Sequence, residues 1–169
     1  YGTRYVTSKK PIRAPEDMKG MKLRAPDMPL SVANARAMGA NPTPMALSEV
    51  YLALQQNVVD GQENPIPTIY TQKFHEVQSH IALTGHVIQL TPVFIAKKKF
   101  DALPDAFKKA LLESIETVTP QINKWIADDE KAQLDEMSKK GVTVTQPDIE
   151  AFRKATQPVI KEFESKWGA

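Results

Sequence analysis

The spacing of apolar positions changes near residue 95 and divides the chain into two kinds of structure. Before this point, short apolar or alternating stretches are separated by proline and glycine, which predicts short strands and helices. Strands are expected at residues 2–8, 21–25 and 58–61, and the β-branched, apolar run 87–96 is the strongest strand candidate. Residues 41–45 contain two prolines and are expected to form an extended link or an edge strand.

Helices are expected where apolar residues recur every three or four positions. The candidates in the first part of the chain are residues 31–38, 49–56 and 65–74. Ser48 is a suitable N-cap for the second of these helices. Proline is tolerated in a first helical turn, so Pro65 can open the third. Residues 11–20 read as a loop with one helical turn.

A helical period continues from Pro104 over a long stretch and predicts a helix that ends at Gly141 and bends at Pro120. Its apolar positions are Phe107, Leu111, Ile115, Val118, Ile122, Ile126, Leu134 and Met137. One more strand is expected at 142–144 and a last helix at 147–167. Strands that alternate with helices predict an α/β fold with extra helix at the C-terminal end.

Composition excludes several classes of function. The 169 residues are 41% apolar and 25% charged, which is typical of a globular protein with a sizeable core. The net charge is +2 and the charges are interspersed, so no nucleic-acid surface is expected. Without cysteine there is no disulfide or thiolate site, and no apolar run of 18 residues predicts a membrane span. The start at Tyr1, without methionine, suggests a processed or trimmed product.

No residue pattern indicates catalysis, a metal or a cofactor. His75, His80 and His86 are five and six residues apart, which does not match zinc-ligand spacing on one helix face. Residues 60–64 lack the twelve-residue ligand alternation of a calcium loop. There is also no serine in a G-x-S-x-G turn and no glycine-rich phosphate loop. We therefore expect no cofactor and no metal.

Arg24 and Asn64 are the polar residues whose positions are most informative. Arg24 lies near the end of an expected strand, where α/β folds gather ligand groups and where a guanidinium can grip a carboxylate through two parallel bonds. Position alone slightly favours a surface ion pair for Arg24. It favours an N-cap role for Asn64, directly before the helix expected from Pro65.

Three stretches of the chain carry a family resemblance: EDMKGMKLRAP (16–26), MGANPTPMALSEVYLALQQNVVDGQENP (38–65) and KFHEVQSHIALTGH (73–86). They resemble the solute-binding proteins of tripartite ATP-independent periplasmic (TRAP) transporters, the DctP-like family. The similarity runs over most of the chain and corresponds to the later part of longer family members.

The resemblance implies a periplasmic-binding-protein-like fold of two α/β lobes, of which only the later part is present. Such a protein closes around a small organic acid in the periplasm and delivers it to TRAP permease subunits in the membrane. Residues 1–86 would be mostly the second lobe. Residues 87–169 would return a strand to the first lobe and add the long C-terminal helices.

The resemblance also implies a ligand site. Arg24, in the K-x-R-x-P segment, would hold the ligand carboxylate, together with Arg4 and with Asn64 of GQENP. Glu63 and His86 match neighbouring polar positions of the same site.

Two further positions, Asp27 and Leu47, would line the same cleft. Family members often carry phenylalanine where this chain has Leu47, so a ring stacked on the ligand would be missing. Dicarboxylates, sugar acids, keto acids and sialic acids would all use the same arginine, and the particular acid stays open.

Two other readings compete with solute binding. In an α/β enzyme acting on a small organic acid, Arg24 would orient the substrate and Glu49 or Glu63 would act as base. In a helical interaction module, residues 104–139 would form the contact surface. That second reading requires exposure of three apolar residues of this helix, namely Ile115, Val118 and Ile122.

Overall fold

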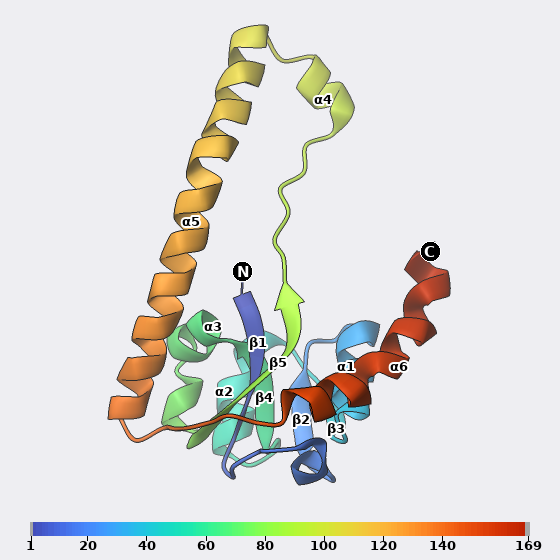
Figure 1. Ribbon diagram of the computed structural model, residues 1–169, viewed down its shortest axis with the longest axis vertical. Helices are drawn as coiled ribbons and strands as arrows, with labels where there is room; N and C mark the ends of the chain where they lie inside the picture. Colours follow the sequence, from blue (N-terminus) through green and yellow to red (C-terminus); the bar gives the residue numbers. More distant parts are fainter. Residues whose placement is uncertain (1, 168–169) are drawn as a thin grey trace.

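The computed structural model describes residues 2–167, which form a mixed six-stranded sheet with helices on both faces (Figure 1). The strand order is β3-β2-β4-β1-β5-β6. The strands are β1 Gly2–Ser8, β2 Lys22–Ala25, β3 Asn41–Pro44, β4 Gly61–Pro65, β5 His80–Gln89 and β6 Thr143–Thr145. β1 runs antiparallel to both of its neighbours, β4 and β5, while β2 is parallel to β3 and β4, and β6 is parallel to β5.

Two apolar cores cover the two faces of this sheet, as expected for an α/β fold. The helices are α1 Pro29–Ala37, α2 Val50–Gln55, α3 Ile66–Thr71, α4 Lys97–Asp101, α5 Asp105–Lys139 and α6 Ile149–Trp167. On one face, Val6 and Leu23 are buried against α1 and against Phe152 of α6. On the other, Ile81 is buried against α2, α3 and Met137 near the end of α5.

One segment leaves this body. Residues 90–129, which we call the arm, comprise an extended stretch, α4 and most of α5, and they project away from the sheet (Figure 1). Their apolar side chains are open to solvent, with Phe94 87% exposed. The chain then returns to the body, where β6 pairs with β5 and α6 packs against α1. No helix among the described residues is long and apolar enough to cross a membrane.

Most of the expected elements are confirmed, with boundaries that move by one or two residues. β1 matches the expectation completely, β2 begins one residue later than expected, and β6 is shifted by one residue. β3 is an edge strand, as its two prolines predict. α5 runs from Asp105 to Lys139 without interruption at Pro120.

The expected strand 58–61 is wrong. Strand β4 is the polar sequence that follows it, Gly61–Pro65, and it is hydrogen-bonded between β1 and β2. Asp60 forms the entry to the strand by accepting the N–H of Lys22 at 2.8 Å. A Cβ on Gly61 would lie 2.2 Å from the carbonyl oxygen of Thr7, so this close approach requires glycine.

The expected strand 87–96 is also wrong over most of its length. β5 begins seven residues earlier, at His80, and ends at Gln89. Within the described part of the chain, no strand pairs with residues 90–96, so their apolar, β-branched composition does not produce a ladder.

The expected helix starts near residues 48 and 65 also need correction. Ser48 lies inside a 3-10 turn, Leu47–Glu49, and Glu49 is the N-cap of α2, so Ser48 does not cap that helix. α3 ends at Thr71 instead of residue 74, because Lys73 adopts a left-handed conformation with φ 58°.

Candidate carboxylate-binding site

The site is built around β4, a strand with three consecutive buried polar side chains. Gln62, Glu63 and Asn64 are all buried, because β4 lies in the middle of the sheet between β2 and β1. Buried polar groups are costly unless they are hydrogen-bonded, so each of these side chains requires a specific partner. The neighbouring strands supply those partners.

Arg4 of β1 is the partner of Glu63. Its Nε and Nη2 both donate to the Glu63 carboxylate, and Nη2 also donates to the Glu63 carbonyl oxygen at 2.8 Å. Nη2 lies 3.2 Å from Asn64 Oδ1, and Nη1 donates to Gln89 Oε1. The Arg4 guanidinium is therefore committed to the protein itself, which leaves it less free for a ligand than the family resemblance implies.

His86 completes this cluster from β5. Its Nε2 lies 3.2 Å from Glu63 Oε2, and its Nδ1 lies 2.7 Å from the hydroxyl of Thr84. The register between β1 and β5 shifts at this point, and Gly85 adopts φ 56°. A glycine at positive φ is typical of a bulge that re-aims a side chain, and here the irregularity turns His86 toward Glu63.

The charge of Glu63 is maintained by these contacts. Burial alone would raise the pKa of Glu63, but hydrogen bonds from His86 and Arg4 outweigh burial and lower it. A carboxylate with a lowered pKa is a weak base, which argues against Glu63 as the base of an enzyme. Glu49, the other candidate base, is exposed in the turn before α2.

Arg24 differs from Arg4 because it has no acidic partner. It is 4% exposed, and its Nε and Nη2 donate to the carbonyl oxygen of Met45 at 3.1 and 2.8 Å. Over residues 2–167 it forms no ion pair, so the expectation of a surface ion pair is wrong. Burial is the main reason why the pKa of Arg24 is lowered; Glu63 opposes this shift and the positive charge of Arg4 adds to it.

Asn64 is part of the sheet and not a helix cap. The N-cap of α3 is Pro65, so the expectation that Asn64 caps this helix is wrong. The side chain of Asn64 accepts from Arg4 through Oδ1 and donates to Gln62 Oε1 through Nδ2 at 2.6 Å. The Asn64 side chain is thus held between Arg4 and Gln62.

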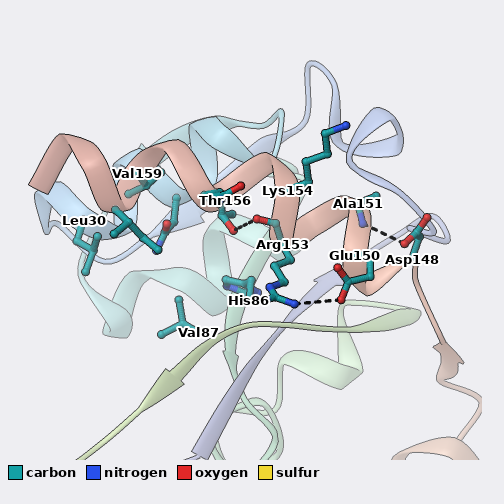
Figure 2. A pocket seen from close by; sticks show the side chains of 13 residues that line it. Leu30, His86, Val87, Asp148, Glu150, Ala151, Arg153, Lys154, Thr156 and Val159 are labelled. Atoms are coloured by element: carbon teal, nitrogen blue, oxygen red, sulfur yellow. Dashed lines mark hydrogen bonds and ion pairs between the residues drawn. The ribbon is translucent and has the colours of Figure 1, made fainter. Parts of the chain in front are cut away.

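Two neighbouring pockets open beside the Arg4 cluster. One, of about 250 Å³, is lined by Arg4, Glu63 and His86 together with α1. The other, of about 890 Å³, lies between α6 and β5 and shares His86 with the first (Figure 2). Arg153 of α6 also lines this larger pocket and pairs with Glu150 at 3.5 Å (Figure 2). Arg24 lines neither pocket.

The remaining expected site residues lie at the surface. Asp27 is exposed just after β2, and Leu47 is 37% exposed in the turn that follows Met45. No sequence pattern singles out the carbonyl of Met45 or the side chain of Thr84, although both hold site residues in place. The signal that could have indicated the bulge is Gly85, a glycine inside an apolar stretch, although no bulge is among the expected elements. No group of three or more metal-ligating side chains occurs in the described part of the chain.

The chain belongs to a family of bacterial extracellular solute-binding proteins. Residues 1–166 match the family described as "Bacterial extracellular solute-binding protein, family 7". This family supports a binding function over the enzyme alternative.

Individual relatives agree with this assignment. The chain is 43% identical to the sialic acid-binding periplasmic protein SiaP of Vibrio cholerae over 167 residues, 99% of this chain and 52% of that protein. It is 39% identical to the 2,3-diketo-L-gulonate-binding periplasmic protein YiaO of Escherichia coli, over 96% of this chain and 50% of that protein. The chain thus spans about half the length of these curated relatives.

Solved structures agree as well. A TRAP periplasmic solute-binding protein of Polaromonas, bound to D-erythronate, superposes with a TM-score of 0.86 at 37% identity. The match covers 99% of this chain and 56% of that one. The mixed sheet and the long helices are therefore those of a TRAP solute-binding protein.

Proposed function

We propose that this chain carries half of an interlobe cleft that binds a small organic acid through its carboxylate, and that Arg24 holds that carboxylate. The observation that carries the proposal is the buried, unpaired charge of Arg24. A buried guanidinium without an anion is unfavourable, and a ligand carboxylate supplies the missing charge. The relatives that bind sialic acid, diketogulonate and erythronate share this chemistry, since all three ligands are carboxylic acids.

The other site residues take supporting roles in this proposal. Glu63 neutralises Arg4, and His86 contacts the same Glu63 carboxylate, so Arg24 provides the main positive charge for the ligand. Asn64, which contacts Arg4, offers an amide N–H to the ligand. Asp27 and Leu47 line the cleft further out, where they contact the part of the acid beyond its carboxylate.

The arm is proposed to contact the other lobe. Its apolar residues include Ile115, Val118 and Ile122, which are 44%, 42% and 43% exposed. This exposure is what an interaction module requires. It is equally what is expected if the arm packs against a second lobe, which the relatives have and these 169 residues do not include. We favour the second explanation because the chain spans half of its relatives. Because β6 pairs with β5 and α6 packs against α1, we propose that residues 2–89 and 130–167 form one lobe, which differs from the division at residue 86 that the family resemblance implies.

Closure of the cleft and delivery to a permease follow from this architecture. A carboxylate bound to Arg24 stabilises the closed arrangement only if it makes more contacts there than in the open one. Release to TRAP permease subunits, and a periplasmic location, are proposed from the family. No bond is made or broken in this function.

A thermal-shift screen tests the proposal on the intact protein, by which we mean this chain together with the other lobe. Sialic acid, 2,3-diketo-L-gulonate, D-erythronate and succinate cover the candidate classes of acid, and erythritol is a control that resembles D-erythronate without its carboxylate. We expect at least one acid to raise the melting temperature by several degrees at concentrations far above its Kd, and erythritol to have no effect. Equal shifts with erythritol would contradict recognition of the carboxylate.

The 169 residues alone are expected to behave differently from the intact protein. Exposed apolar residues along the arm favour self-association, and half a cleft binds ligand weakly. Analytical ultracentrifugation should show association that increases with concentration, and calorimetry should show weaker binding than in the intact protein. A monodisperse monomer with full ligand affinity would contradict the proposed role of the arm and of the other lobe.

A further inference from the structure

We propose that Thr7, Gln62 and Gln78 are positioning residues of the carboxylate site. They do not reach the ligand themselves, but they fix the side-chain amide of Asn64 in the one orientation that offers an N–H. This inference rests on the proposed function, because it assigns residues that serve the same site. It is carried by a continuous chain of hydrogen bonds through the middle of the sheet.

The first part of this hydrogen-bond chain links Arg4 to two side chains of β4. Arg4 Nη2 lies 3.2 Å from Asn64 Oδ1, and Asn64 Nδ2 donates to Gln62 Oε1 at 2.6 Å. Asn64 and Gln62 are two residues apart on the same strand, so their side chains share one face of the sheet.

The second part continues into β1 and the turn before β5. Gln62 Nε2 donates to the hydroxyl of Thr7 at 3.1 Å, and this hydroxyl lies 3.3 Å from Gln78 Oε1. Gln78 Nε2 donates to the carbonyl oxygen of Val77 at 3.1 Å. Thr7, Gln62 and Gln78 are all buried, so water does not replace a lost partner easily.

The two ends of this hydrogen-bond chain determine the orientation of every side-chain amide and hydroxyl between them. A guanidinium only donates and a backbone carbonyl only accepts. The carbonyl of Val77 requires the amide nitrogen of Gln78, which leaves Gln78 Oε1 to accept the proton of Thr7. The hydroxyl of Thr7 then accepts from Gln62 Nε2, and Gln62 Oε1 faces Asn64.

Asn64 is thereby constrained from both sides. Its oxygen must face Arg4 and its nitrogen must face Gln62. One hydrogen of Nδ2 is used for Gln62, and the other remains for a ligand carboxylate. If the amide turned over, it would present an oxygen to that carboxylate and repel it.

The test is Thr7→Val in the intact protein, with Thr7→Ser as the matched control. Valine keeps the shape of threonine but breaks the chain, whereas serine keeps the hydroxyl. Two quantities are measured: binding of sialic acid, 2,3-diketo-L-gulonate and D-erythronate by calorimetry, and the NMR signals of the Asn64 side-chain amide without ligand, assigned with Asn64→Ala. We expect valine to shift the Asn64 signals and to weaken binding about tenfold, and serine to do neither.

A destabilised control separates positioning from loss of stability. Val142→Ala shortens a buried side chain before β6, outside the hydrogen-bond chain, and is expected to lower the melting temperature without moving the Asn64 signals. Unchanged Asn64 signals in Thr7→Val would overturn the inference, whether or not any acid binds. Shifted signals with unchanged affinity would overturn it too. The proposed function fails separately, if Arg24→Lys keeps its affinity.

Discussion

Replacing Arg24 with lysine is expected to weaken binding of a carboxylate ligand by about 100-fold or more. Lysine keeps the positive charge but lacks the planar pair of donors that can hold both oxygens of a carboxylate. It also loses the contacts of Nε and Nη2 with the Met45 carbonyl, which fix the guanidinium in place. Calorimetry on the intact protein, with the acid that gives the largest thermal shift, measures the effect.

The matched control is Arg36→Lys, because Arg36 is an exposed arginine on α1. It should bind the acid with unchanged affinity. If Arg24→Lys also binds normally, Arg24 does not hold the carboxylate and the proposed function is wrong.

A third variant, Arg24→Met, tests the physical reason behind this prediction. Burial of an unpaired cation costs free energy, and replacement by an apolar side chain of similar length removes that cost. Without ligand, the free energy of unfolding of Arg24→Met should equal that of the wild type or exceed it by about 1–2 kcal/mol. A large loss of stability would mean that Arg24 is a structural residue first.

The parts of the fold that the sequence predicts well are those where local pattern and packing agree. α5 and α6 have long helical periods, and β1 alternates between the two faces of the sheet. The strand expected at 87–96 failed for a physical reason: β-branched residues fit a strand only where a neighbouring strand exists. Residues 90–96 have no such neighbour in the described part of the chain, whereas the less regular His80–Gln89 has two.

The site could be predicted only through the family resemblance. Hydrophobic pattern alone placed a strand at 58–61 and ended it before the polar residues, because three buried polar side chains in a row contradict any apolar period. Pairing with β1 and β2 on both sides makes this burial possible. Sequence spacing does not reveal three-dimensional contacts. It therefore could not show that Arg4 pairs with Glu63 or that Arg24 has no acidic partner.

Replacing Glu63 with glutamine is expected to lower the free energy of unfolding by about 3–5 kcal/mol at neutral pH. Glu63 is 5% exposed and Arg4 is 7% exposed, so the variant leaves a buried guanidinium without its anion. Arg24 lies close enough to Arg4 to feel its charge, and the negative charge of Glu63 partly offsets this repulsion. Urea denaturation measures the loss. Glu76→Gln is the control, because Glu76 pairs with Lys73 at the surface and should contribute less than about 1 kcal/mol.

The same pair predicts how stability depends on pH. The pKa of Glu63 is lowered from 4.5 in the folded protein, so its contribution is fully present above that value and is lost as the pH falls through the lowered folded pKa. Glutamine has no proton to gain. The difference in unfolding free energy between wild type and Glu63→Gln should therefore be constant from about pH 7 to 5 and shrink steadily below it. A difference that stays constant in acid would show that the cost of Glu63→Gln is lost packing and not lost charge.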